Sequence, residues 1–207
     1  LGSVRVPLGT QDFSSFLLRA QSSGAQVIGL ANAGSDTLNA IKQANEFGLV
    51  QGGQQLAGLV MFVTDVHSLG LDVAQGLQFT TAYYWDRNDA SREFGQRFYD
   101  KRGVMPNMDQ VGTYSAVLSY LKAVEQVGSD DSDAVRAQLG EMEIDDVFGT
   151  GRIRADGLFQ HDMYLVEAKT PDASKGEWDL LTVKRTIPGD EAYQSLEEGG
   201  CPLVAKN

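Results

Sequence analysis

The first part of the chain alternates short apolar runs with amphipathic stretches. Apolar residues recur at helical spacing after Thr10 or Asp12, and again after Ser35 or Asp36, which offer the N-caps of two helices. The apolar runs around these helices predict strands at 4–8, 27–30, 56–63 and 77–84, with a short turn or helix around residue 67. Strands that alternate with helices in this order predict an α/β fold with a parallel sheet flanked by helices.

The pattern changes after residue 84. Helical periodicity predicts three helices with no strand between them, over 89–103, 109–127 and 130–142. A tight hairpin at 149–157, an antiparallel strand pair at 163–168 and 178–183, a short helix at 190–198 and a tail at 201–207 follow.

The three consecutive helices need an apolar surface that the first 85 residues do not obviously supply. We expect the helix face of Val117, Leu121 and Val124 to be exposed in the isolated chain, where it favours aggregation or dimerisation. Another part of the protein, which the family resemblance described below implies to be a missing N-terminal half, or a second copy of the chain would supply the surface.

Composition narrows the possible partners. The net charge of −11 argues against nucleic acid and anionic membranes, because both bind basic surfaces. No apolar run approaches the ~20 residues of a membrane-spanning helix. The first residues, LGSVRVPLG, lack the layout of a signal peptide. The single cysteine, Cys201, excludes an internal disulfide and a multi-cysteine metal site.

The motifs of common catalytic and cofactor sites are missing from the sequence. His67 and His161 are far apart, and His161-Asp162 lacks the further histidines of a metal phosphohydrolase site. The acidic residues near 130 lack the glycine of a calcium loop and are better explained as helix caps. Neither a phosphate-binding loop, a dinucleotide-binding glycine pattern nor a nucleophile elbow is present. We therefore expect no catalytic residues, no metal and no cofactor.

The stretch Gln26 to Phe47 is the best candidate for binding. A buried strand ends in the small residues Ala31, Asn32, Ala33 and Gly34, and a helix begins directly after them. Open α/β sheets bind ligands at the carboxyl ends of their strands, where helix N–H groups are free. Small residues let a ligand approach that backbone, so this turn is predicted to form half of a binding cleft.

Four segments in order resemble the type I periplasmic solute-binding proteins of ABC transporters, in the branch that binds leucine, isoleucine and valine. They are TQDFSSFLLRAQSSGAQVIGLANAGSDTLNAIKQANEFG, TDVHSLGLDVAQGLQFTTAYYWD, QVGTYSAVLSYLKAVEQVGSDD and FGTGRIRADG, and the resemblance covers essentially the whole chain. It implies a periplasmic-binding-protein-like type I fold, two-lobed in the full protein, with this chain as roughly the C-terminal half.

The resemblance also implies a domain organisation. Residues 1–84 would be the sheet and helices of the C-terminal lobe, and residues 85–158 would belong to the N-terminal lobe. Residues 159–207 would return to the C-terminal lobe and end in a tail. Tyr83, Tyr84 and Trp85 would then lie at a hinge, although aromatic residues at a strand end are also common structural features.

Ligand-binding positions carry over from the family one by one. Asn32 and Ala33 match a turn that contacts ligand in the leucine-binding relatives. Phe62, Thr64 and Asp65 match the place of an acidic residue that holds the ligand's ammonium group. Tyr114 matches an aromatic residue that reaches toward the cleft. Structural alternatives are a turn residue for Asn32, an N-cap for Asp65, packing for Tyr114 and a core position for Phe62.

Two departures from the family pattern bear on the solute. The turn has Asn-Ala where amino-acid binders often carry aromatics, and Asp65 stands out of register with the acidic ligand. An aromatic or other apolar carboxylate therefore competes with a branched-chain amino acid as the solute.

The predicted function is the exported, periplasmic or extracellular, solute-binding component of an ABC importer, with a small-molecule solute and a membrane permease as partners. The signal peptide would lie outside this chain. A sensor or receptor ectodomain of the same fold is one alternative, and an α/β enzyme that uses Asp65 or His67 is another.

Overall fold

A computed structural model describes residues 1–202 and 204 of the chain. Residues 203 and 205–207, in the predicted tail, lie outside the described residues. The contacts divide the chain into two compact units, residues 1–81 with 165–185, and residues 82–164 with the segment from 186 onward. The chain thus passes from one unit to the other after residues 81, 164 and 185. Whether these units are lobes of a longer protein stays a prediction.

The first unit begins with alternating helices and strands. They are α1 (Ser14–Ser22), β1 (Val27–Leu30), α2 (Gly34–Glu46), β2 (Gln55–Gly58), α3 (Val63–Leu69), α4 (Leu71–Ala74) and β3 (Gln78–Thr81). Strands β1 and β2 are parallel, and so are β2 and β3, which confirms the predicted α/β fold with its parallel sheet.

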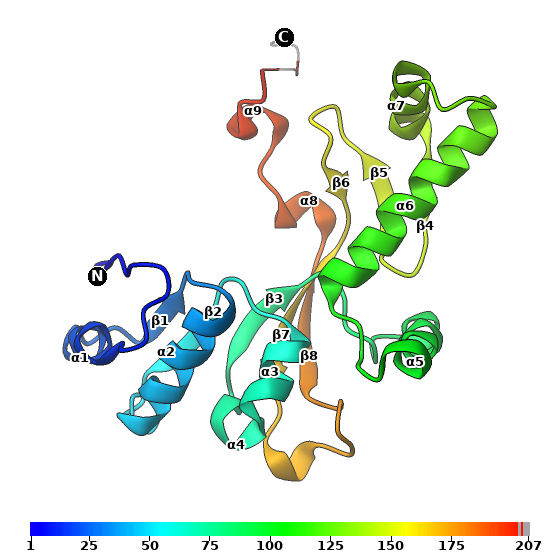
Figure 1. The fold of residues 1–207 in the computed structure, drawn as a ribbon. Helices are drawn as coiled ribbons and strands as arrows, with labels where there is room; N and C mark the ends of the chain where they lie inside the picture. The colour runs from blue at the N-terminus through cyan, green and yellow to red at the C-terminus, as the bar shows by residue number, and fades with distance from the viewer. Residues whose placement is uncertain (203, 205–207) are drawn as a thin grey trace. The chain divides into compact units, whose positions relative to one another are not determined.

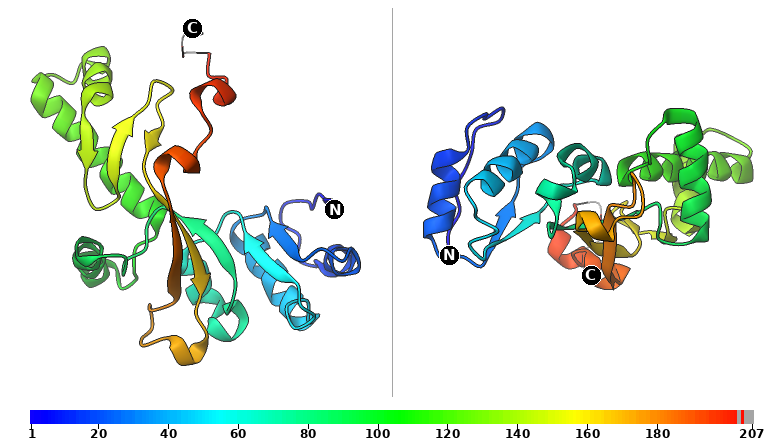
Figure 2. Two further views of the ribbon diagram at one scale, coloured as in Figure 1. Left: turned by 180° about the vertical axis from the view of Figure 1, so that it is seen from behind. Right: turned by 90° about the horizontal axis from the view of Figure 1, so that it is seen from below.

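Two later strands extend this sheet. Strands β7 (Met163–Ala168) and β8 (Leu181–Ile187) give the order β1-β2-β3-β7-β8, and the short helix η1 (Pro171–Ala173) lies between them in the chain. Leu56, Phe79 and Val166 are buried strand residues. Helices α2 and α3 lie on the same face of strands β1 to β3, as the front and back views show (Figures 1 and 2).

The second unit combines helices with a small antiparallel sheet. Its elements are α5 (Asp89–Arg102), α6 (Met108–Val127), α7 (Ser132–Glu141), β4 (Glu143–Asp145), β5 (Thr150–Ile153), β6 (Phe159–Gln160), α8 (Gly189–Ala192) and α9 (Leu196–Gly199). Strands β4, β5 and β6 pair antiparallel in that order. One core cluster contains Tyr83, Phe94 and Val111, and another contains Ala123, Val135 and Met142.

Several sequence predictions are wrong in detail. Residues 4–8 form no strand, since Pro7 has no N–H to donate and the chain turns at residues 8 and 9. The strand predicted over 56–63 ends at Gly58, and α3 begins at Val63. The helix predicted over 190–198 is two short helices, α8 and α9.

The exposed face of α6 is largely as predicted. Val117 and Leu121 are more than half exposed. Val124 is not, because it packs against the core cluster that includes Val135 of α7. A helix nearby in the sequence thus covers one end of the face that was expected to be bare.

No helix in residues 1–202 combines the length and the apolar character that crossing a membrane requires.

The N-terminus of α6 gives a stability prediction. The Asn107 side chain accepts hydrogen bonds from the N–H groups of Asp109 and Gln110, and the Gln110 side chain accepts one from the Asn107 N–H. We expect Asn107→Ala to lower the free energy of unfolding in urea by about 1 kcal/mol, because helix N–H groups lose their acceptor. Thr113→Ala, an exposed change one turn later, is the control and should shift it by under ~0.5 kcal/mol; equal effects would contradict the capping role.

Candidate functional site

The parallel strands bring the two predicted ligand-binding loops to the same edge of the sheet. Leu30, the last residue of β1, is in register with Gly58, the last residue of β2. The N–H of Leu59 donates to the carbonyl of Leu30 at 3.0 Å, so the loops after the two strands start side by side. We call residues 31–33 and 59–62 the strand-end surface.

The first loop of the strand-end surface leads into a helix that no side chain caps. Ala33 is the extended residue before α2. In the part of the chain that the structure describes, no side chain forms a capping hydrogen bond with the first N–H groups of this helix. Ser35 and Asp36 were the predicted caps, and this prediction is wrong. The Asp36 carboxylate is buried and accepts from the Gly9 N–H at 3.0 Å instead. The first N–H groups of α2 are therefore available to an anionic ligand.

Asn32 has a local partner in this loop. Its Oδ1 accepts a hydrogen bond from the Thr37 hydroxyl at 3.3 Å, across the start of α2. Asn32 is half-buried and Ala33 is exposed. The contact fits a turn residue that orders the loop, and the ligand roles of Asn32 and Ala33 stay predictions.

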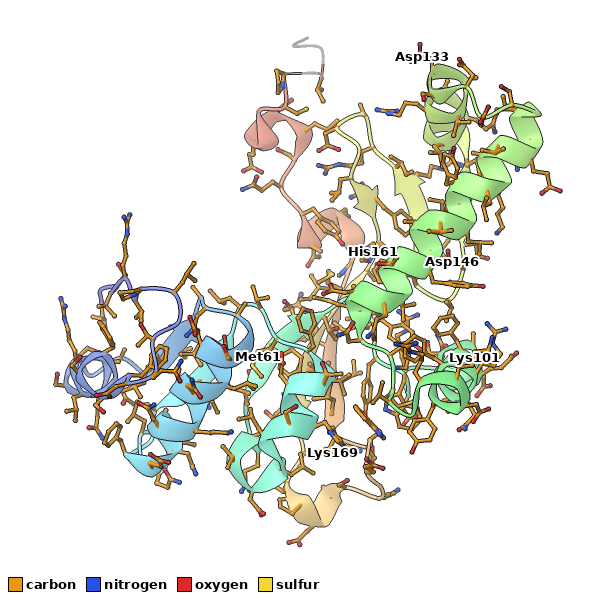
Figure 3. The ribbon with its side chains drawn as sticks, in the orientation of Figure 1. Met61, Lys101, Asp133, Asp146, His161 and Lys169 are labelled. Atoms are coloured by element: carbon orange, nitrogen blue, oxygen red, sulfur yellow. The ribbon has the colours of Figure 1, made fainter. Side chains whose placement is uncertain are left out.

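The second loop is shaped by a close packing of Met61 on Gly58. A Cβ placed on Gly58 would lie 2.5 Å from the Met61 sulfur and 2.7 Å from its Cγ, so only glycine leaves room for this side chain. Met61, labelled in Figure 3, is 1% exposed. Because the Met61 side chain packs over Gly58, strand β2 ends there. The neighbouring Leu59 and Val60 remain on the outside, 61% and 42% exposed.

Leu59 and Val60 are candidate binding residues that the sequence did not identify. They belong to an apolar run interpreted as a buried strand, and an apolar run alone gives no sign that the chain turns. The one signal is Gly58 inside the run, since an isolated glycine often marks a close approach of other atoms. Both residues belong to the strand-end surface, and the Leu59 N–H donates to the carbonyl of Leu30, four residues before the uncapped α2 begins.

Three of the predicted ligand-binding residues, Phe62, Thr64 and Asp65, lie around the start of α3. The N-cap alternative for Asp65 is wrong, since Phe62 is the N-cap residue of α3 and Asp65 is its third residue; from there the Asp65 carboxylate accepts from the Phe62 N–H at 2.9 Å. Burial raises the pKa of Asp65, and the bond from Phe62 partly opposes that rise. Phe62 and Thr64 are half-buried beside it. Asp65 therefore stabilises the start of α3, while ligand roles for Phe62, Thr64 and Asp65 stay predictions.

His67 also has structural partners. Its ring stacks on Trp178 with centroids 4.0 Å apart, and its Nε2 lies 3.1 Å from Glu177 Oε1. These contacts tie α3 to the segment before β8. The enzyme alternative, in which Asp65 or His67 would do acid–base work, stays a prediction.

Tyr114 and the predicted hinge residues belong to the second unit. Tyr114 is 41% exposed and packs its ring at an angle against Phe94, with centroids 4.9 Å apart. Tyr83 is buried, and its hydroxyl donates to the Ser91 carbonyl at 2.9 Å. Tyr83, Tyr84 and Trp85 follow the first crossing of the chain closely. A ligand role for Tyr114 and a hinge role for the aromatic triplet stay predictions.

His161 is a buried core residue of the second unit. Its ring contacts Phe148, Phe159 and Tyr193, and the Tyr193 hydroxyl lies 3.0 Å from its Nε2 (labelled in Figure 3). Burial lowers its pKa, against a rise from its contact with the Asp162 carbonyl. In the described part of the chain, no three His, Cys, Asp or Glu side chains come together as a possible metal site.

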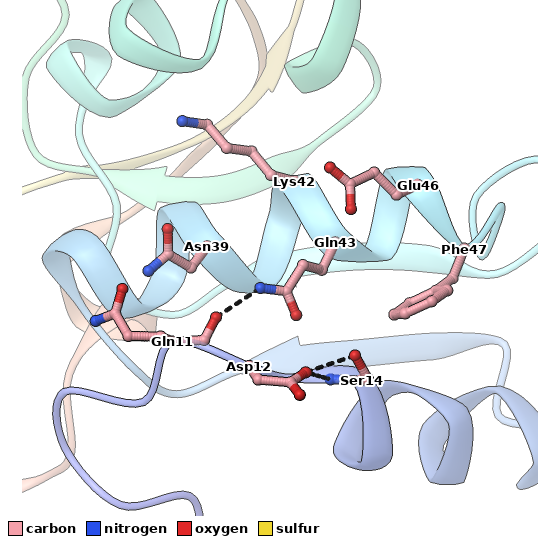
Figure 4. A pocket seen from close by; sticks show the side chains of 8 residues that line it. All are labelled: Gln11, Asp12, Ser14, Asn39, Lys42, Gln43, Glu46 and Phe47. Carbon is pink, nitrogen blue, oxygen red and sulfur yellow. Dashed lines mark hydrogen bonds between the residues drawn. The ribbon is translucent and has the colours of Figure 1, made fainter.

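A separate hollow of about 410 Å³ lies between the start of α1 and α2 (Figure 4). Its lining includes Gln11, Asp12, Lys42 and Glu46, so it combines charges of both signs. The Gln43 amide donates to the Gln11 carbonyl at 2.7 Å across it. None of its lining residues belongs to the strand-end surface.

Comparisons with known proteins agree on one family. The family model described as periplasmic binding protein matches residues 1–177. A periplasmic binding protein from Burkholderia mallei is 53% identical, with a TM-score of 0.92 over 98% of this chain and 54% of that one. A branched-chain amino acid ABC transporter periplasmic ligand-binding protein from Burkholderia xenovorans is 46% identical, with a TM-score of 0.86 over 95% and 53%.

A curated relative extends the likeness to another genus. Leu/Ile/Val-binding protein homolog 6 of Brucella melitensis is 29% identical over 92% of this chain and 51% of its own length. The chain thus spans about half the length of the proteins it matches.

The packing of Met61 on Gly58 predicts a stability coupling. Gly58→Ala should lower the free energy of unfolding by about 1–3 kcal/mol, because the new methyl group overlaps Met61. Met61→Ala should cost about 2–5 kcal/mol through the cavity it leaves. In urea titrations the double variant should lower the free energy of unfolding by less than the sum of the two single changes. Truncating Met61 makes room for the methyl group added to Gly58. Strictly additive losses would contradict the packing.

Burial of His161 predicts a pH dependence. Because its pKa is lowered in the folded protein, the unfolded chain binds a proton first as the pH falls through about 6.5. The free energy of unfolding should therefore fall more steeply for the wild type than for His161→Gln between about pH 7.5 and 5. Parallel curves for the wild type and His161→Gln would contradict the assignment.

Proposed function

The chain belongs to the periplasmic binding protein family, and we propose that it is part of the solute-binding component of an ABC importer. It would bind a small organic solute in the periplasm and present it to a membrane permease. The proteins it resembles support this proposal, since their names are those of binding proteins.

The observation that carries the proposal is the composition of the strand-end surface. Free N–H groups at the start of α2 favour a negative charge, because they carry the positive end of the helix dipole. Leu59 and Val60 expose apolar side chains beside them. A carboxylate attached to an apolar body matches both features, with the carboxylate at the helix and the apolar part over Leu59 and Val60.

The two candidate classes of solute, branched-chain amino acids and apolar or aromatic carboxylates, differ in whether they carry an ammonium group. A branched-chain amino acid carries an ammonium group that needs an acidic partner in the site. The one acidic side chain predicted there, Asp65, already accepts a hydrogen bond from the Phe62 N–H at 2.9 Å, so its carboxylate is engaged at the start of α3. We therefore favour an apolar or aromatic carboxylate without an ammonium group, bound mainly by backbone groups.

Calorimetric titration of the longest form of the protein that its gene encodes tests this proposal. We expect saturable binding of aromatic or branched aliphatic carboxylates and weaker binding of their α-amino derivatives. Leu59→Asp should weaken binding by at least about tenfold, because it places a carboxylate beside the bound one.

Leu18→Asp is the matched control, since Leu18 is a similarly exposed apolar residue on α1. It should leave the affinity within about twofold. If no carboxylate binds, or if Leu59→Asp and Leu18→Asp weaken binding equally, the proposed site is wrong. Turnover of a bound compound would instead support the enzyme alternative.

A further inference from the structure

The chain crosses between its two units three times, after residues 81, 164 and 185. Arg87 follows the first crossing closely, and Tyr164 is the last residue before the second. Arg87 Nη1 donates to the Tyr164 hydroxyl at 2.9 Å, and the guanidinium lies over the Tyr164 ring, 4.9 Å from its centroid. Both residues belong to the second unit, so within that unit one side chain joins the segments of the first two crossings.

Arg87 is also held by contacts away from Tyr164. Its Nη2 donates to the Val147 carbonyl at 2.9 Å and its Nη1 to the Phe148 carbonyl at 3.3 Å, in the turn that leads into β5. Its guanidinium lies 5.7 Å from the centroid of the Tyr83 ring, within the range of a cation–π contact. A guanidinium presents several donors in one plane, so a single side chain makes all these contacts at once.

The segment after the third crossing is tied to the segment before the second. Gly189 follows the third crossing, and its N–H donates to Asp162 Oδ1 at 3.1 Å. The Gln160 side-chain amide donates to the Gly189 carbonyl at 2.9 Å. A Cβ placed on Gly189 would lie 3.0 Å from the carbonyl carbon and oxygen of His161, so a glycine permits this close approach. All of these residues belong to the second unit.

We propose that Arg87 is a positioning residue, which holds the three crossings together as one support on the second unit. It acts on the second crossing through Tyr164, and the bond between Asp162 and Gly189 carries the restraint to the third. Rotation of the backbone is then concentrated at the crossing residues themselves, because the segments beyond them are held by hydrogen bonds. The proposal is independent of the proposed function, since it involves neither the solute nor the strand-end surface.

Hydrogen exchange of the backbone amides tests this role in the longest form of the protein that its gene encodes, without added solute. Arg87→Met keeps an apolar stem but removes the donors and the charge. We expect exchange to become at least about fivefold faster at residues 163–166 and at Gly189, as well as at residues 147–149. Tyr164→Phe keeps the ring and removes the hydroxyl. It should speed exchange at residues 163–166 and leave residues 147–149 within about twofold of the wild type.

Arg97→Met is the matched control, because the Arg97 guanidinium also lies over an aromatic ring of the second unit, 5.5 Å from the centroid of Phe94. It should leave exchange in all these segments within about twofold. The amides of α6 report any loss of overall stability. Acceleration by Arg87→Met that is confined to residues 147–149, or that is equally large in α6, would overturn the proposal. An equal effect of Arg97→Met would do the same. Unchanged exchange at residues 163–166 in Tyr164→Phe would overturn it even if Arg87→Met does not fold.

Discussion

The parallel alignment of β1, β2 and β3 is the constraint on which the candidate site depends. Parallel strands end at the same edge of their sheet, so the chain must leave each strand there and return through a helix. The register of Leu30 with Gly58 places the start of α2 beside the turn that precedes α3. The start of α2 and the loop of Leu59 and Val60 thus follow the same edge of the sheet although the sequence separates them by more than twenty residues. Neither feature alone distinguishes a binding surface from an ordinary loop.

Local packing then decides which side chains reach that surface. Met61 occupies the space over Gly58, and this turns Leu59 and Val60 outward. Asp65 accepts from the Phe62 N–H, so this acidic group stabilises a helix start. Asp36 accepts from the Gly9 N–H and leaves α2 uncapped. These three contacts shape the surface for which we propose a carboxylate on an apolar body.

The sequence predicts the architecture better than the site. Periodicity and helix caps place α5, α6 and β1 within a residue or two, because these signals are local. Helical spacing of Leu38, Ile41 and Ala44 likewise identifies α2, while the role of Asp36 depends on Gly9, 27 residues away. The turn at Gly58 depends on Met61 packing into the space of a missing side chain, which no periodicity reveals. Val124 was expected to be exposed because its partner Val135 belongs to a different helix.

Chemical shifts of the backbone amides test most directly the claim that a carboxylate binds at the ends of the parallel strands. In a titration with an aromatic carboxylate, the account predicts saturable shifts for the amides of residues 33–36 and 59–60, with smaller changes at the hollow between α1 and α2. Shifts confined to that hollow, or saturable binding that leaves residues 33–36 unchanged, would contradict a binding surface at the ends of the parallel strands.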